Sequence, residues 1–155
     1  MRIKRMAGAY SCLRYHLVFS TKDREPFITT QISSRLHEYL GGIIKGNGGL
    51  PLSIGGTTDH VHLLVSLRPD TSISEIIRVL KSNSSKWIHE NFSKCKAFTW
   101  QRGYGAFSVS RSQTEGVKAY IADQLKHHRT RSFEDEFVEF LKRNGVEYDS
   151  RYIWV

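Results

Sequence analysis

Two histidines separated by one apolar residue stand at His60 and His62, inside a run of residues that favour β-strands. Alternate side chains of a strand point to the same face, so both imidazoles are expected on one side of a sheet. Tyr120 and Gln124 are four residues apart in a helical stretch and should share a helix face. Together they offer two imidazoles and an amide oxygen to a divalent metal, with a phenol beside it. A metal that polarises a phosphate and a hydroxyl that attacks it are the minimal parts of an enzyme that cuts and joins DNA.

Each of these residues also has an ordinary structural explanation. Alternating histidines can be half-exposed polar positions of a strand, and Tyr120 can be a packing residue whose hydroxyl meets water or a carbonyl group. Gln124 is a good helix former for a solvated face. The functional interpretation depends on their joint occurrence, because Tyr120, Gln124 and His127 form a shoulder beside the apolar stripe of one helix. That stripe, which would pack on the sheet and bring the shoulder over the histidines, consists of Val117, Ile121 and Leu125.

The elements that must position these residues follow the order strand, helix, strand, strand, helix, strand. Strands are expected at 13–20, 50–54, 60–67 and 105–110. Helices are expected from Thr30 to the glycines at 46–49, after a capping box of Ser72 and Glu75, around Tyr120, and at 133–141. This order is the split βαβ pattern of an α+β, ferredoxin-like antiparallel sheet with two helices on one face. The third helix, which carries the tyrosine, is then expected on or near the other face.

The strand at 60–67 carries two sets of side chains with different tasks. The aliphatic set of Val61, Leu63 and Val65 is expected to face the first two helices. The histidines alternate with that set, so they should project from the opposite face of the sheet, where a ligand could bind.

Length and charge restrict the class of protein. A chain of 155 residues with 39% hydrophobic and 25% charged residues fits one compact domain, here 1–155, with 132–155 as a C-terminal helix and aromatic tail. The formal net charge of +8 favours a polyanionic partner, usually nucleic acid, over the alternative of a charge kept only for solubility. Cys12 and Cys95 are too few for a disulfide framework or a zinc ribbon, which indicates a reducing compartment. The absence of a long apolar run predicts no membrane segment.

Three stretches of the sequence resemble the single-tyrosine HUH transposases. They are TDHVHLLV at 58–65, the region 100–105 with WQ and GYG, and YIADQ at 120–124. This family comprises insertion-sequence transposases and REP-associated tyrosine transposases, which move DNA through single-stranded intermediates. The resemblance extends from about Tyr15 to about His128. It adds a known family context to the metal and phenol chemistry that the residues suggest by themselves.

The resemblance implies a role for each central residue. His60, His62 and Gln124 would hold Mg²⁺ or Mn²⁺, and because all three are neutral the ion would keep its full charge for the phosphate. Tyr120 would attack single-stranded DNA, form a 5′-phosphotyrosine and free a 3′-hydroxyl, and a second 3′-hydroxyl would reseal the strand. The bond energy would stay in the phosphotyrosine, so no nucleotide cofactor is needed, and the sequence contains no Gly-Lys-Ser/Thr phosphate loop.

The resemblance also implies a biological setting. The protein would be a metal-dependent endonuclease and strand transferase, a transposase for DNA transposition and recombination, that recognises hairpins at element ends. The alternatives are a REP-associated HUH nickase and a domesticated ferredoxin-like DNA-binding protein without transposition. A homodimer in the bacterial or archaeal cytoplasm is expected, bound to the nucleoid through DNA. The segment 110–114 is long enough for the tyrosine helix to serve either its own subunit or the partner.

DNA contacts can be predicted by residue type alone. Basic and hydroxyl side chains suit phosphates, and aromatic ones in a glycine-containing loop suit stacking on unpaired bases. The candidates are Arg78, Lys81, Ser85, Lys86, Trp100, Arg102, Tyr104, Arg129 and Arg131. Trp100 could equally cap the core.

The remaining histidines and the C-terminal aromatic residues leave alternatives open. His127 and His128 could add a metal ligand, shuttle a proton or contact phosphates, or they could simply end a solvated basic helix. His16 and His37 are expected to be structural. The aromatic tail could cover a partner subunit or fold back on its own sheet, and it contains Tyr148, Tyr152 and Trp154.

Overall fold

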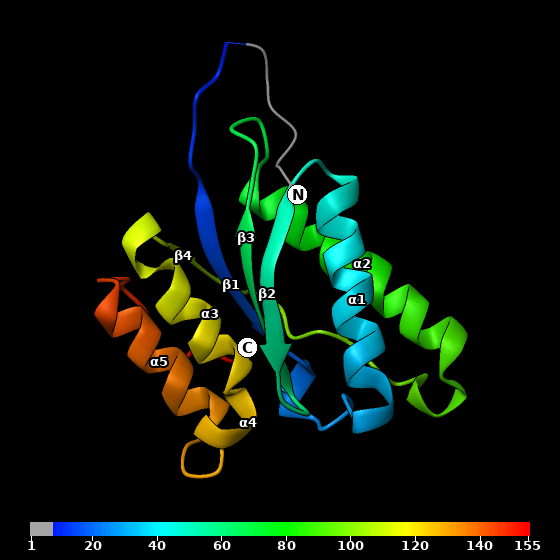
Figure 1. Ribbon diagram of the computed structural model, residues 1–155. Helices are drawn as coiled ribbons and strands as arrows, with labels where there is room; N and C mark the ends of the chain where they lie inside the picture. Colours follow the sequence, from blue (N-terminus) through cyan, green and yellow to red (C-terminus); the bar gives the residue numbers. More distant parts are fainter. Residues whose placement is uncertain (1–7) are drawn as a thin grey trace.

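A four-stranded antiparallel sheet forms the centre of the protein in the computed structural model, which describes residues 8–155 (Figure 1). Its strands, in the spatial order β2-β3-β1-β4, are β1 (Arg14–Ser20), β2 (Leu50–Gly56), β3 (His60–Ser66) and β4 (Gly105–Ser108). Every neighbouring pair is antiparallel. The four strands lie where the sequence predicts them, although β4 is shorter than expected.

Helices cover both faces of this sheet (Figure 1). One face carries α1 (Thr30–Gly46) and α2 (Ile73–Asn91), and the other carries α3 (Thr114–Ala122), α4 (Gln124–His127) and α5 (Phe133–Arg143). Short 3-10 turns occupy Lys22–Arg24, Ser93–Cys95 and Arg111–Gln113. The α+β, ferredoxin-like prediction is therefore confirmed, with the tyrosine-bearing α3 on the face opposite α1 and α2. None of the helices within residues 8–155 is long and apolar enough to cross a membrane.

The two faces of β3 separate core packing from polar chemistry. Val61, Leu63 and Val65 are fully buried and belong to the large apolar cluster beneath α1 and α2. His60 and His62 alternate with them and lie on the other side of the sheet, as the period-two pattern predicts. That side has a smaller apolar cluster of its own, made of Val18, Phe107, Phe133, Phe137 and Leu141.

Only half of the predicted capping box at the start of α2 forms. The Ser72 hydroxyl accepts a hydrogen bond from the Glu75 backbone N–H at 3.3 Å, as expected for an N-cap. The Glu75 carboxylate does not return to Ser72 and accepts from the Arg78 guanidinium instead. This i, i+3 ion pair on the exposed helix surface replaces the reciprocal bond of the box.

The tyrosine helix is shorter than the sequence pattern predicts. It ends at Ala122, because Asp123 has backbone angles of φ −99° and ψ 21°, and a new helical turn begins at Gln124. The Asp123 N–H is shared between the carbonyls of Ala119 and Tyr120, a common arrangement at a helix end. The break turns Leu125 outward, where 70% of it is exposed, so Leu125 is not part of the apolar stripe as expected.

Gly55 sets how closely α3 approaches the sheet. It lies on β2 directly opposite His62 in the strand pairing. A Cβ at this position would lie 2.5 Å from the backbone carbonyl oxygen of Ile121, a distance that no real side chain tolerates. The missing side chain therefore lets α3 come close enough for its tyrosine to reach the histidines of β3.

Replacing Gly55 by alanine should destabilise the protein and lift α3. Because the new methyl group would meet backbone rather than a flexible side chain, we expect a loss of about 1–3 kcal/mol in the free energy of unfolding, measured by urea denaturation. Gly42→Ala is the matched control, since Gly42 lies in α1 and a methyl group added there would have no neighbouring atom within 4 Å. An alanine there should keep or raise stability by up to about 1 kcal/mol. Equal stability of the two variants would contradict this role of Gly55.

The C-terminal tail folds back on its own chain. The Trp154 ring packs against Phe133 and Phe137 of α5, and the Arg24 guanidinium lies 4.9 Å above its centre. Its carbonyl accepts a hydrogen bond from Gln101 at 3.2 Å. Of the two arrangements that the sequence allows for the tail, the structure shows the intramolecular one for Trp154, whereas Tyr148 and Tyr152 remain exposed.

Candidate metal and tyrosine site

The two histidines of β3 lie beneath a cover of helices rather than on an open face. Both are fully buried, with Ser20 opposite His60 and Val18 opposite His62 on the neighbouring β1. The cover comes from α3, α4 and α5 (Figure 1). These imidazoles are therefore not part of the apolar core under α1 and α2, and the groups that face them are largely polar.

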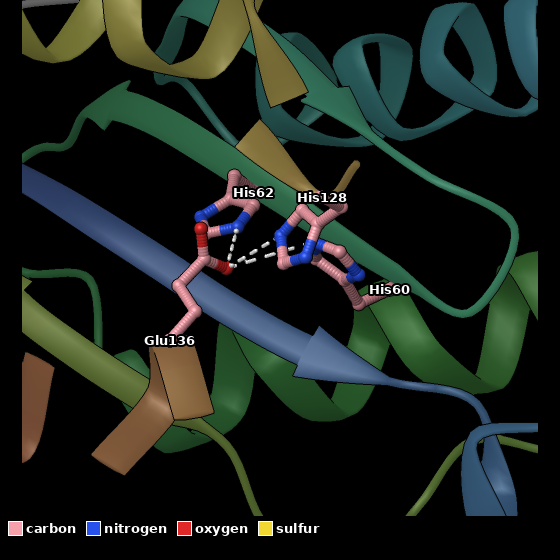
Figure 2. A group of neighbouring side chains, drawn as sticks. All are labelled: His60, His62, His128 and Glu136. Carbon is pink, nitrogen blue, oxygen red and sulfur yellow. Dashed lines mark hydrogen bonds and ion pairs between the residues drawn. The ribbon is translucent and has the colours of Figure 1, made fainter. Parts of the chain in front are cut away.

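Five side chains converge on one point at this site (Figure 2 shows four of them). The Nε2 atom of His60 lies 2.9 Å from Gln124 Oε1, and that of His62 lies 2.9 Å from Glu136 Oε1. His128 Nε2 lies between the two oxygens, 3.1 Å from the amide and 3.2 Å from the carboxylate. One ligand atom from each of the three histidines and the glutamate falls within 4.8 Å of the others. This is a spacing that a single metal ion can bridge.

Each of the three imidazoles uses its Nδ1 for a hydrogen bond of 2.7 Å that points away from this centre. The partners are the Asp59 carboxylate for His60, the imidazole Nε2 of His16 for His62, and the Arg131 carbonyl for His128. Such outer bonds fix ring orientation and direct Nε2 inward, as is common around metal-bound histidines. His16, expected to be structural, thus holds one of the two central histidines in place.

Tyr120 reaches the same centre within its own chain. Its hydroxyl donates a hydrogen bond to Oε2 of Glu136, the carboxylate whose other oxygen contacts His62. The ring centre lies 6.0 Å from that of His62, and the other face of the phenol stacks on His127 at 4.5 Å. A cavity of about 510 Å³ opens beside the phenol, lined by residues of β4, α3 and α5, and its polar lining includes His16, Ser112, Gln113 and Arg143.

Electrostatics make the resting tyrosine neutral and the glutamate ionised. Burial, and then the neighbouring Glu136 carboxylate, raise the pKa of Tyr120 above its ordinary value. Burial also opposes ionisation of Glu136, but hydrogen bonds from His128, His62 and Tyr120 outweigh it and hold the pKa of Glu136 well below its usual range. The phenol therefore donates and the carboxylate accepts, and a cation is needed before the phenol can ionise at neutral pH.

The two buried imidazoles of His16 and His62 should make the metal-free protein sensitive to acid. Burial lowers the pKa of His62 to about 4 and that of His16 to about 3. The unfolded chain then binds more protons than the folded one below about pH 6.5, so stability should fall as the pH drops from 6.5 toward 4. The pKa of His128 is shifted upward and acts in the opposite direction, whereas burial also lowers the pKa of His37, which adds to the effect of His16 and His62.

Thermal denaturation in the presence of EDTA checks this expectation. We expect the melting temperature to fall by on the order of 10 °C between pH 7 and pH 4.5, which corresponds to several kcal/mol of stability. His16→Gln, which removes one of the two buried imidazoles, should reduce the slope. A melting temperature that is constant over this range would show that neither imidazole is kept neutral by burial.

One residue of the site, Glu136, is not evident from the sequence pattern. It lies in the apolar stripe of α5 between Phe133 and Phe140, where an acidic residue has no reason to be unless a polar group faces it. That position is the available signal. His128, for which the sequence leaves a ligand role and a solvated helix end open, is largely buried and joins the cluster. His127 is exposed and contacts the site only through the Tyr120 ring.

The predicted DNA contacts do not gather at this centre. The α2 candidates lie across the sheet from the histidines, where Arg78 pairs with Glu75 and Lys86 lies 3.9 Å from Glu90. Lys81 donates to the carbonyls of Gln101 and Gly103 at 2.8 and 2.5 Å, and burial lowers its pKa to about 8. The amine is thus committed to holding the loop at 101–104. Ser85 lies half-buried on the same helix.

Trp100 belongs to the core, which corrects its placement among the base-stacking residues. Only 8% of it is exposed, its indole N–H donates to Ser84 at 2.9 Å, and its ring meets Phe19 edge-on. The neighbouring Arg102 and Tyr104 are exposed in the loop before β4 and stay free for a partner.

The remaining two candidates, Arg129 and Arg131, lie beside α5. Arg129 is exposed, whereas Arg131 forms an ion pair of 2.6 Å with Glu139 and provides the carbonyl that holds His128. Arg129 can therefore meet a phosphate directly, while contact of Arg131 with DNA requires exchange of its ion pair.

Comparison with known proteins finds transposases. The family model described as "Transposase IS200 like" matches residues 9–124. The ISDra2 transposase TnpA of Deinococcus radiodurans is 26% identical over 129 residues, which cover 80% of this chain and 92% of that protein. The transposase for insertion sequence element IS200 of Salmonella typhimurium is 26% identical over 121 residues, which cover 75% of this chain and 79% of the relative.

Two solved structures share the fold. A candidate transposase of Deinococcus radiodurans R1 superimposes with a TM-score of 0.65 at 26% identity, covering 78% of this chain and 97% of that one. A REP-associated tyrosine transposase bound to a REP hairpin gives a TM-score of 0.57 at 14% identity, covering 80% and 73%, which is a likeness of fold alone. Because the family model spans β1 through Gln124, and with it both central histidines and the tyrosine, the chain belongs to the IS200-like transposase family.

Proposed function

We propose that this transposase cleaves and rejoins single-stranded DNA through a 5′-phosphotyrosine at Tyr120, with a divalent metal held beside it. One observation carries the proposal. The Glu136 carboxylate contacts the Tyr120 hydroxyl with one oxygen and the His62 imidazole with the other. The proposed nucleophile and a proposed metal-binding nitrogen thus contact the two oxygens of one carboxylate, so the phenol and the ion would lie close enough for a scissile phosphate to reach both.

The residues fit a divalent ion. His60, His62 and Gln124 direct two imidazole nitrogens and an amide oxygen to one place, and outward hydrogen bonds hold the two rings. When bound, a divalent ion would supply positive charge that polarises the scissile phosphate and favours the phenolate. The hydrogen bonds that His60 donates to Asp59 and that His62 forms with His16 would then keep the ring nitrogens oriented while substrate enters and leaves.

The chain's own residues perform the transfer. Tyr120 loses its proton and its oxygen forms a bond to phosphorus, while the bond from phosphorus to the 3′-oxygen breaks and that oxygen leaves as a hydroxyl. The close approach of Ile121 to Gly55 fixes the helix α3 that carries Tyr120, and stacking on His127 restricts the phenol ring, so the nucleophile is oriented before DNA binds. Rejoining is the same exchange in reverse, with a 3′-hydroxyl as the attacking group.

The substrate is expected to be single-stranded DNA beside a hairpin at an element end. The cavity of about 510 Å³ next to Tyr120 gives an unpaired strand a route to the phenol from the side of β4 and α5. A duplex has no free single strand that could enter such a cavity. The net charge of +8 supports a nucleic-acid partner in general, and a homodimer is proposed from the family.

Incubation with the chain's own flanking genomic DNA tests the proposal. Both strands should be offered separately as labelled oligonucleotides with Mg²⁺ or Mn²⁺, and products separated on a denaturing gel. We expect a covalent protein–DNA adduct with one of the single strands and none with the annealed duplex. A REP-associated nickase would form the same adduct without joining element ends, and a DNA-binding protein would bind and form no adduct, which would refute the proposal.

A further inference from the structure

We propose that His128 and Glu136 complete the metal site, and that the resulting set of three imidazoles and two oxygens prefers a transition-metal ion such as Mn²⁺ to Mg²⁺. The inference rests on the proposed function, which needs only His60, His62 and Gln124. It concerns the C-terminal segment, because the family match ends at residue 124 and both added residues lie beyond it. The two residues are thus features of this chain that family membership does not require.

The first argument comes from hydrogen-bond roles. His60 and His128 must each donate through Nδ1, since their partners there are a carboxylate and a carbonyl that can only accept. In the neutral form that a metal ligand must have, each ring then carries a lone pair on Nε2, whereas in the metal-free protein a proton on His128 Nε2 is shared with Glu136. For His128 this lone pair lies 3.1 Å from Gln124 Oε1 and 3.2 Å from Glu136 Oε1, and for His60 it lies 2.9 Å from the same amide oxygen.

When the rings are neutral, acceptors face acceptors at the centre of the site. Three imidazole nitrogens and two side-chain oxygens surround one point, and Figure 2 shows the three imidazoles and the Glu136 carboxylate. A single proton can satisfy one pair of these atoms, whereas a divalent cation can satisfy all five at once. The donor set is that of a cation site, and the ligand atoms of Glu136 and His128 lie within 4.8 Å of those of His60 and His62.

The second argument comes from burial. Glu136 is 1% exposed, and its helix presents Phe133, Phe137 and Phe140 on the same side. An ionised carboxylate beneath an aromatic cover is costly unless a cation compensates it. A metal ion shared with the histidines provides that compensation and fastens α5 over the site.

The ligand types decide which ion the site prefers. Imidazole nitrogen is a good ligand for transition metals and a poor one for Mg²⁺, which favours oxygen and retains several waters. Adding His128 raises the nitrogen count from two to three, and adding Glu136 provides a charged oxygen.

Calorimetric titration of the DNA-free protein with Mn²⁺ and with Mg²⁺ tests this inference. We expect one Mn²⁺ per chain and at least tenfold weaker binding of Mg²⁺. Glu136→Gln and His128→Ala should each weaken Mn²⁺ by about tenfold or more, since even outer-sphere partners of metal ligands are worth about 10–100-fold. Asp135→Asn, an equal change of charge on the exposed side of α5, and His127→Ala, the adjacent imidazole, should leave Mn²⁺ affinity unchanged.

Pulsed EPR of the wild-type protein with Mn²⁺ gives a second measurement that depends on no variant. Counting the coordinated imidazole nitrogens should give three. A count of two, or unchanged Mn²⁺ affinity in both Glu136→Gln and His128→Ala, would overturn the inference, as would a wild-type protein that does not bind Mn²⁺. Adduct formation with single-stranded DNA distinguishes failure of this inference from failure of the proposed function. If only this inference fails, the adduct can persist in Glu136→Gln and His128→Ala. If the proposed function fails, the wild type forms no adduct.

Discussion

Replacing Tyr120 by phenylalanine is expected to abolish the covalent adduct with single-stranded DNA while leaving DNA binding nearly unchanged. The substitution removes one oxygen atom, the proposed nucleophile, and keeps the ring that stacks on His127 and packs against Phe140. Adduct yield on a denaturing gel should fall below detection. Affinity for the hairpin substrate, measured by fluorescence anisotropy, should change less than about threefold, because the hydroxyl that is removed bonds to Glu136 inside the site and is only one of many groups near the DNA.

Tyr104→Phe is the matched control for this experiment. Tyr104 is an exposed tyrosine in the loop before β4 and 40% of it is accessible to solvent. Loss of its hydroxyl should leave the adduct yield intact. An adduct that survives in Tyr120→Phe would mean that another residue attacks the DNA, and the assignment of Tyr120 would then be wrong.

Replacing His60 by alanine should lower the rate of DNA cleavage by at least about 10³-fold. Loss of this imidazole removes a proposed ligand from the centre of the site, and charge stabilisation by a metal is worth several kcal/mol in the transition state. Treatment of the wild-type protein with EDTA should produce a loss of similar size, and added Mn²⁺ should restore cleavage only in the wild type. Single-turnover kinetics with labelled DNA measure both effects.

Mixing the two inactive variants shows whether each site is built from one chain. In the structure Tyr120 reaches the histidines of its own chain, so a mixture of His60→Ala and Tyr120→Phe subunits should remain inactive. Recovery of adduct formation would show that the tyrosine of one subunit serves the histidines of the other. Cleavage by His60→Ala alone at a rate near that of the wild type would contradict the metal assignment.

Much of this fold follows from simple periodicities in the sequence. Alternation along β3 separates Val61, Leu63 and Val65 from the histidines, and the hydroxyl of Ser72 marks the start of α2. These features are local, because a strand side chain has only two faces to choose from and an N-cap acts within one turn. Tyr120 is far from the histidine pair in the sequence, so its association with them depends on their joint occurrence and on the family resemblance rather than on a local pattern.

The parts that could not be predicted depend on contacts between distant segments. Nothing near Glu136 in the sequence shows that its helix will cover β3, and an acidic residue in an amphipathic helix is usually solvated. Whether α3 ends at Asp123 depends on a small local conformational preference, and this end decides whether Leu125 is buried or exposed. From the sequence, Trp100 could pack in the core or stack on DNA. The hydrogen bond from its indole N–H to Ser84, which places it in the core, is visible only in the structure.

Mass-spectrometric mapping of the trapped adduct is the most direct test of the central claim. The protein should be incubated with its single-stranded substrate and Mn²⁺, digested with protease and nuclease, and searched for a nucleotide-bearing peptide. We predict that the modification lies on Tyr120 through a 5′-phosphate, and that the released strand has a 3′-hydroxyl that a polymerase can extend. A nucleotide on any other residue, or a phosphate at the released 3′ end, would contradict the account.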